Sequence, residues 1–475
     1  MIRMSANLQG NKNAARLSLL GFVLAISGGL ASSAHARATA EDVAKLGKQL
    51  TCMGAERAGT ASGVAEYTGK WLGAAPGMVV EPGRLPGDPY AAEKPLFVIT
   101  AQNYAQYQER LSEGQRAMFR KFPATFRMSV YPAHRDFRYD DSICRVVAQN
   151  AAEAELAANG LTVNEGHMGA SPFPFPKNGQ ELLWNGVLPA LVHVEYRDTD
   201  LAIVYPNGGI IWGAQLIWNL SRANDPQLRG RKYEGVATYT RGVTLAPERE
   251  KGIMTRVIDR FSMDRESRLA WQYIASTRRV RQAPGFGFDM PMPSSANTLT
   301  IDDARLFNGS GERYEWKLQG KREIFIPYNN YRLESRAVGE NRYARLLTPN
   351  HENPDLIRWE LHRVWVLEGR VKEGYRHVYP QRTLYLDEDS WLFTMADSYD
   401  AQGRIWKFNW VNNVYQPGPN IFNQFSAFYH DLNAGTYTVY DLTQAKPQGV
   451  IVNPPDADYG KPAFYSIENL KNAGY

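Results

Sequence analysis

Paired acidic residues are the first candidates for chemistry in this sequence, because a glycosidase needs only two carboxyl groups, a general acid and a base or nucleophile. Every pair falls where the sequence predicts a turn or the start of a helix. Carboxylates in such positions are normally solvated, so we expect no catalytic pair among them. The pairs are Asp140-Asp141, Asp302-Asp303 and Asp387-Glu388-Asp389.

The motifs of other catalytic and metal sites are incomplete. His351-Glu352 lacks the second histidine of a zinc-protease helix, and the chain contains no C-x-x-C and no G-x-S-x-G. Gly69-Lys70 is followed by Trp71, where a phosphate-binding loop has Ser or Thr. We therefore predict no metal site, no cofactor and no enzymatic activity.

Two cysteines and a group of arginines are the remaining candidates. In an exported chain, Cys52 and Cys144 favour a disulfide, with two separately buried thiols as the alternative. Arg278, Arg279 and Arg281 lie at the end of a predicted strand, before a Pro-rich loop. They could face phosphate headgroups or another lipid anion, and a solvated basic strand end is the alternative.

Residues 1–36 have the pattern of a secretory signal peptide. Lys12 and Arg16 precede the apolar run Leu17–Leu30, and Ala34-His35-Ala36 is a cleavage signal. A membrane anchor is the alternative, but the run is short and rich in Gly and Ser. We therefore expect the protein in the periplasm. The formal charge of +5 falls to about +2 without this segment, which does not favour a nucleic-acid partner.

The chain that must position these residues changes character near residue 190. Residues 37–190 predict short helices and loops, with N-caps at Thr39, Ser112 and Asn178. Residues 191–446 predict many antiparallel strands, and residues 447–475 a Pro- and Gly-rich tail that wraps the surface. We therefore predict an α+β fold, in which residues 37–446 form one domain: a large curved antiparallel sheet, as in a half-open barrel, with the N-terminal helices packed on one face.

The stretch from Asp355 to Trp410 predicts four or five successive strands that are rich in aromatic residues. Large aromatic side chains on a sheet need an apolar cover, which is either protein or an apolar ligand. An aromatic stripe alone is more often core than ligand pocket. If a ligand provides the cover, the candidates for its binding site are Trp359, Trp365, Tyr385 and Trp406.

Several long motifs occur in order along nearly the whole chain after residue 36. They include Met53-Gly-Ala-Glu-Arg-Ala-Gly59, Ser171-Pro-Phe-Pro-Phe-Pro-Lys-Asn-Gly179 and Ile326-Pro-Tyr-Asn-Asn-Tyr331. With these motifs the chain resembles an exported bacterial family, domain of unknown function 1329. That family is similar in fold to outer-membrane lipoprotein-sorting carriers, which are half-open antiparallel barrels with a helical lid over an apolar cavity. It is also found beside exporters of the resistance-nodulation-division type.

The resemblance implies a carrier for a lipid or other hydrophobic molecule, accessory to envelope lipid trafficking or export. It implies an inner-membrane exporter of the resistance-nodulation-division type as a partner and peripheral contact with membranes, but no catalytic residues. A second hypothesis is a protein-interaction module for an exporter or an envelope-stress regulator, without a ligand. The third and least favoured is a periplasmic hydrolase that uses one of the acid pairs.

Overall fold

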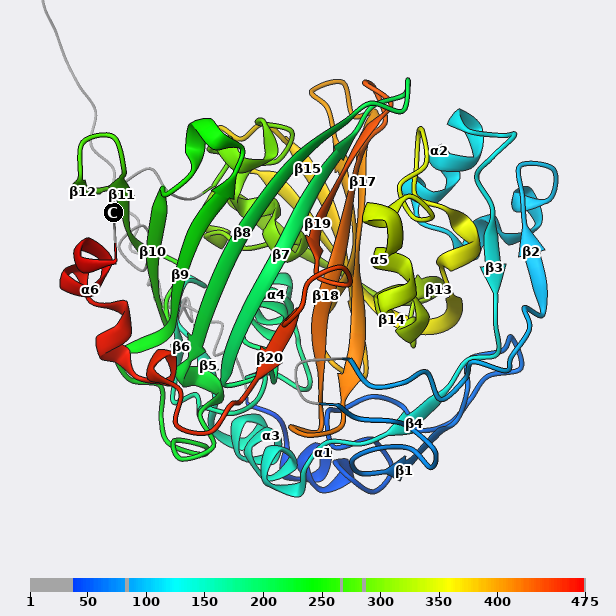
Figure 1. The fold of residues 1–475 in the computed structure, drawn as a ribbon. Coiled ribbons are helices and arrows are strands. Elements are labelled where there is room, and N and C mark those ends of the chain that lie inside the picture. Colours follow the sequence, from blue (N-terminus) through cyan, green and yellow to red (C-terminus); the bar gives the residue numbers. More distant parts are fainter. Residues whose placement is uncertain (1–36, 82–84, 265–267, 284–287, 474–475) are drawn as a thin grey trace, which may run out of the picture. The chain divides into compact units, whose positions relative to one another are not determined.

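One large sheet dominates the residues that the structure describes, which are 37–81, 85–264, 268–283 and 288–473 (Figure 1). The predicted signal peptide lies outside the described residues. The computed structural model places sixteen strands in this sheet, in the order β12-β11-β10-β9-β8-β7-β19-β18-β17-β16-β15-β14-β3-β2, with β13 beside β14 and β20 beside β7. The strands are β2 (Phe97–Ile99), β3 (Met128–Val130), β7 (Val194–Val204), β8 (Ile210–Ser221), β9 (Val236–Ala246), β10 (Met254–Arg260), β11 (Arg268–Ile274), β12 (Arg279–Gln282), β13 (Tyr314–Pro327), β14 (Trp359–Val371), β15 (Gln381–Asp387), β16 (Phe393–Tyr399), β17 (Ile405–Gln416), β18 (Ile421–Asp431), β19 (Thr436–Leu442) and β20 (Val450–Val452).

The sheet is almost entirely antiparallel, as predicted; β3, which is parallel to β14 at the pair Val130 and Trp359, is an exception. Strands β12 and β2 stand at the two ends of the order, so the sheet is open and curved and does not close into a barrel. The predicted meander is confirmed, because β14, β15, β16 and β17 pair with one another in sequence.

The helices begin where the capping residues predict. Thr39 accepts a hydrogen bond from the amide of Asp42, Asn178 accepts one from Glu181, and Ser112 forms a capping box with Gln115. The helices are α1 (Ala40–Lys45), α2 (Glu113–Lys121), α3 (Asp141–Glu153), α4 (Gly179–Val187), α5 (Arg336–Tyr343) and α6 (Ile467–Asn472), and two small sheets pair β1 (Tyr67–Trp71) with β4 (Arg135–Phe137) and β5 (Glu155–Leu156) with β6 (Val163–Asn164).

The two faces of the meander are covered by different parts of the chain. On one face, Gly114 of α2 lies against Asp397 and Phe408. On the other, Gly186 of α4 lies against the ring of Phe393, and Phe307, which follows the 3₁₀ helix η5 (Ile301–Leu306), packs edge-on to that ring. Nearly every residue of β14 to β18 is consequently buried, whichever way its side chain points.

Strands β8 to β11 are less completely covered, since most of their residues are only half-buried. The C-terminal segment packs on one of their faces. There Tyr465 joins Val194 and Leu220 in one apolar cluster, and Leu470 joins Met254 and Tyr273 in another. This segment also supplies β20 to the sheet and places α6 beside β12.

Candidate functional site

A pocket of about 430 Å³ lies between residues 79–81 and 85–91, the 3₁₀ helix η7 (Tyr331–Glu334) with the start of α5, and residues 443–450. Its volume is in the range of small-molecule sites, and its wall is mostly apolar, as in such sites. The lining residues are Val79, Glu81, Leu85, Pro86, Gly87, Asp88, Ala91, Tyr331, Arg332, Glu334, Ser335, Arg336, Thr443, Gln444, Lys446, Gly449 and Val450.

One wall of this pocket contains a buried carboxyl group, that of Glu334. It accepts hydrogen bonds from the side chains of Asn412 (2.9 Å) and Gln444 (2.7 Å) and from the backbone and hydroxyl of Ser426 (3.1 and 3.0 Å). All of these donors are neutral, and burial raises the pKa of Glu334 to about 7. The pocket therefore has a polar group beside it that changes charge near neutral pH.

The mouth of the pocket combines exposed apolar and charged side chains. Val79, on the lining, and its neighbour Val80 are 62% and 51% exposed, unusually high values for valine. Lys446 is held by Asp198 and Asp200, and the guanidinium of Arg336 donates to the carbonyl of Pro447. The wall exposes mostly apolar surface but also carries both acidic and basic side chains, a combination that suits a small amphipathic molecule.

The structure does not bring the four predicted lining aromatics together. Trp359 and Trp365 lie six residues apart on β14 and share one face, but Tyr385 pairs with Val366 and therefore points to the opposite face. Trp359 packs on Trp410, and Trp365 stacks on Trp391 with 6.0 Å between ring centroids. Their partners here are protein side chains.

The other two predicted residues, Tyr385 and Trp406, each donate a hydrogen bond to an aspartate. The hydroxyl of Tyr385 donates to Asp397 (3.0 Å), beneath α2. Trp406 lies at an irregularity of the β16–β17 pairing, where its indole donates to Asp431 (3.1 Å) and its ring packs edge-on against Tyr379. Trp359 and Tyr385 belong to the buried core and Trp365 packs against it, whereas Trp406 is half-buried. Contact of these four residues with a ligand stays a prediction.

The expectation that Asp302 and Asp303 are solvated is wrong, because both are buried. Asp302 accepts hydrogen bonds from His377 (2.8 Å) and Arg382 (2.9 Å), while Asp303 accepts them from Tyr379 (2.9 Å) and Arg382 (3.3 Å). Burial opposes the ionisation of Asp302, but Arg382 and His377 lower its pKa nonetheless. Asp302 and Asp303 therefore belong to a buried hydrogen-bonded cluster, and a substrate has no access to them as a hydrolase would require.

The same expectation is wrong for Asp387, Glu388 and Asp389, which are also buried. Arg135 binds Asp389 through two nitrogens (2.6 and 2.7 Å), and Arg363 and Lys321 bind Glu388 (2.7 and 3.1 Å). The partners come from far along the chain, so turn composition could not reveal them. By contrast, Asp141 is exposed, and Asp140 lies at the start of α3, where its side chain accepts a hydrogen bond from the amide of Ser142 (2.8 Å).

Residues Asp387, Glu388 and Asp389 form a turn that we call the acid turn. His362 of β14 and the turn residues Asp387 and Asp389 are three potential metal ligands, whose ligand atoms lie within 4.8 Å of one another. Arg135 already occupies both oxygens of Asp389, and His362 shares a hydrogen bond with Glu360 (3.0 Å). A cavity beside Asp389 measures only about 10 Å³, the space of one water molecule. A cation here would lie next to a bound guanidinium, so the arrangement fits a buried ionic network better than a metal site.

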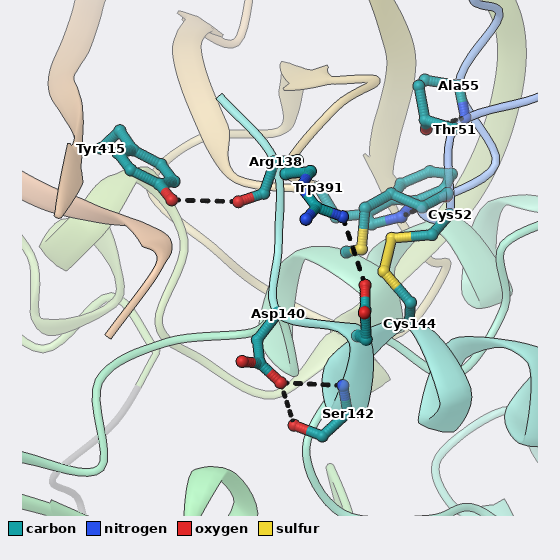
Figure 2. The surroundings of a disulfide bond; sticks show 11 residues. Thr51, Cys52, Ala55, Arg138, Asp140, Ser142, Cys144, Trp391 and Tyr415 are labelled. Carbon is teal, nitrogen blue, oxygen red and sulfur yellow. Dashed lines mark hydrogen bonds and ion pairs between the residues drawn. A yellow bond between two sulfur atoms is a disulfide. The ribbon is translucent and has the colours of Figure 1, made fainter. Parts of the chain in front are cut away.

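Cys52 and Cys144 are joined by a disulfide, with 5.2 Å between their Cα atoms (Figure 2). The bond links the turn around Thr51 to helix α3. The carbonyl of Met53 in that turn accepts a hydrogen bond from the indole of Trp391 (3.1 Å). The disulfide therefore connects α3 to the part of the N-terminal region that packs on the acid turn of the meander.

Arg278, Arg279 and Arg281 are exposed and lie far from the pocket lining, on β12 and the turn before it. Among the described residues none of them takes part in an ion pair. Arg279 pairs with Ile274 and Arg281 with Gln272, so both side chains project from the same face of the sheet. The structure thus presents them as a group.

A family model described as "Protein of unknown function (DUF1329)" matches residues 98–471. The chain belongs to the DUF1329 family. The curated protein "Uncharacterized protein PA3922" of Pseudomonas aeruginosa is 37% identical over 382 residues, which cover 80% of this chain and 82% of that protein. The resemblance stated from the sequence motifs is thereby confirmed.

Solved structures similar to this DUF1329 protein show low sequence identity. A DUF1329 family protein from Desulfovibrio piger is 15% identical with a TM-score of 0.39, covering 59% of this chain and 92% of that one. LolA superfamily protein NE2245 from Nitrosomonas europaea is 10% identical with a TM-score of 0.36, covering 62% of this chain and all (100%) of that one.

Sequence reasoning missed the pocket of this DUF1329 protein because its polar wall is assembled from distant segments. Glu334 and its partners Asn412, Ser426 and Gln444 are 78 to 110 residues apart. No local pattern marks Glu334, although it lies shortly after the motif that ends at Tyr331.

None of the helices in the described residues is long and apolar enough to cross a membrane.

Proposed function

We propose that this DUF1329 protein binds a small hydrophobic or amphipathic molecule and carries it in the periplasm, accessory to envelope lipid trafficking or export. The observation that supports this most directly is the pocket of about 430 Å³ with its mostly apolar wall. An apolar cavity of about 150 Å³ already accommodates a benzene molecule, so this pocket has room for a larger apolar group. Burying an alkyl chain there contributes roughly 0.8 kcal/mol per CH₂ group.

The signal-peptide pattern of residues 1–36 supports the periplasmic location. The partnership with an exporter of the resistance-nodulation-division type rests on the family resemblance alone. Trp359, Trp365, Tyr385 and Trp406 would reach a ligand only if the covering helices moved away, so the pocket near Glu334 is the site to test first.

Ser335 offers a way to fill the pocket without disturbing the fold. It is exposed, lines the pocket and makes no side-chain cap at the start of α5. We expect Ser335→Trp to reduce the uptake of a fluorescent fatty acid at least tenfold, because the indole occupies the mouth. Gln402→Trp, at an exposed turn outside the lining, is the matched control and is expected to bind like the wild type.

Native mass spectrometry after mild purification tests the function itself. Recovery of empty wild-type protein together with no uptake of fatty acid would show that the protein is not a carrier of such molecules. Normal uptake by the Ser335→Trp protein would instead show that the ligand binds in another part of the molecule.

The second candidate, a protein-interaction module without a ligand, is favoured by the meander. Both faces of β14 to β18 are filled by the protein's own side chains, which leaves no ligand space there in the described residues. Consistent co-purification with an inner-membrane protein, with no small molecule ever bound, would favour this candidate. The acids of the two pairs Asp302-Asp303 and Glu388-Asp389 are buried and bound by cationic side chains, which gives no support to the hydrolase.

A further inference from the structure

Three hairpin turns lie in a row along one end of the sheet. They are residues 205–209 between β7 and β8, 247–253 between β9 and β10, and 275–278 between β11 and β12. The strands from β7 to β12 pair successively and antiparallel, so every second connection falls at the same end. Figure 1 shows these turns along the upper edge of β7 to β12. We call this row the tip edge.

The net positive charge of the tip edge lies at its third turn. Arg278 and Arg279 are exposed at the third turn, Arg281 follows on β12, and all three are without ion pairs among the described residues. In the second turn, Arg249 and Lys251 pair with Glu250 and Glu248, so this turn adds no net charge. The whole chain without residues 1–36 carries only about +2, so this charge is local.

Two aliphatic side chains on the adjoining strand ends are also exposed. Ile211 is 44% exposed on β8, just after the first turn, and Leu245 is 37% exposed on β9, just before the second. In the order of the sheet, β8 and β9 stand four and three strands from β12, so these side chains lie along the same edge as the unpaired arginines. Apolar side chains and unpaired cations on one surface are the combination with which interfacial segments bind a bilayer: the cations meet anionic headgroups, and the apolar groups enter the region below them.

We propose that the tip edge docks this protein onto the surface of a bilayer that contains anionic lipids. This surface is distinct from the pocket, and its function does not depend on what the pocket binds. An acidic peptide could satisfy the same arginines, but it would leave Ile211 and Leu245 exposed to water, which favours the bilayer. Each arginine near an anionic surface contributes on the order of a fourfold to tenfold gain in partitioning.

Vesicle co-sedimentation of the purified protein tests this proposal. We expect binding to vesicles of equal parts phosphatidylcholine and phosphatidylglycerol, no binding to phosphatidylcholine alone, and loss of binding at about 1 M salt, where charges are screened beyond ~3 Å. The variant R278Q/R279Q/R281Q is expected to bind about a hundredfold more weakly. The variant I211S/L245S is expected to lose about tenfold through its apolar contribution.

The matched control R145Q/R345Q/R376Q removes the same charge from exposed arginines that also lack ion pairs among the described residues. It is expected to bind vesicles like the wild type. The proposal is overturned by equal binding to both kinds of vesicle, by no binding to either, or by equal losses in the two triple variants. It is also overturned if polyglutamate binds the tip edge while vesicles do not. Fatty-acid uptake by the triple variant stays normal under the proposal, which separates this result from failure of the pocket.

Discussion

Gly179, the first residue of α4, gives the most direct test of how this helix covers the sheet. A Cβ atom built at Gly179 would lie 2.3 Å from both the carbonyl carbon and the carbonyl oxygen of Trp316, and 2.7 Å from the amide nitrogen of Lys317. These are backbone atoms of β13, which cannot turn aside as a side chain can. In Gly179→Ala, α4 must therefore move away from the strand by about 1 Å to restore normal contact.

Two opposing effects set the size of the change. Alanine is the better helix former, by up to about 1 kcal/mol, although less at the first turn than inside a helix. Overpacking against a well-packed region typically costs about 1–3 kcal/mol and sometimes more. The overlap is severe, and the buried side chains Leu182 and Leu183 move with the helix. We therefore expect Gly179→Ala to lower the free energy of unfolding by about 1–3 kcal/mol.

Urea unfolding followed by tryptophan fluorescence measures this change as a lower midpoint with an unchanged slope. Gly418→Ala is the matched control, because a Cβ atom there meets nothing within 4 Å. It is expected to stay within about 0.5 kcal/mol of the wild type. If the two variants proved equally stable, α4 would not pack against β13 as closely as the structure shows.

Three further predictions concern buried charge, the disulfide and pH. Arg382→Met leaves two buried carboxylates without their guanidinium and is expected to destabilise the protein by about 3–5 kcal/mol. Arg404→Gln, at an exposed turn, is the control and is expected to cost less than about 1 kcal/mol. Comparable urea midpoints for the two variants would contradict this prediction. Replacing Cys52 and Cys144 by serine opens a loop of 92 residues and is expected to cost about 4 kcal/mol relative to the oxidised wild type, while the reduced wild type, as the control, should match the variant. The pKa of Glu334 is raised from 4.5 to about 7, so the folded state binds more protons across this window and the wild type loses stability as pH rises through it. Glu334→Gln lacks this loss, so its stability relative to the wild type should rise by about 3 kcal/mol between pH 4.5 and pH 8. The other buried acids titrate in both proteins, so their contributions cancel in this difference. A difference in stability that stays constant with pH would show that Glu334 ionises normally.

Local patterns predicted the parts of this fold that depend on neighbours in sequence. The caps at Thr39, Ser112 and Asn178 and the strands of the meander are confirmed, because hydrogen bonds three residues apart and period-two alternation determine them.

The cover of the sheet could not be predicted in the same way. The shared face of Trp359 and Trp365 follows from their even spacing, but the face of Tyr385 depends on the register between strands, which the turn sets. The burial of Asp389 depends on Arg135, which is 254 residues away. For this reason, acidic residues in a turn look solvated when only their neighbours in the sequence are considered. The acid turn of this protein is buried instead, because its partners are distant in the sequence.

The pairing of β7 with β19 has a consequence for how the chain reaches its folded state. Strands β7 to β12 and β13 to β19 form two hydrogen-bonded groups that meet through this one antiparallel pair, and its partners are more than 230 residues apart. During synthesis the edge of β7 stays unpaired until residues 436–442 emerge, so contacts of high sequence separation must limit the folding rate. An open edge of eleven residues is also a template for aggregation, and chains truncated before β19 should associate with one another rather than fold.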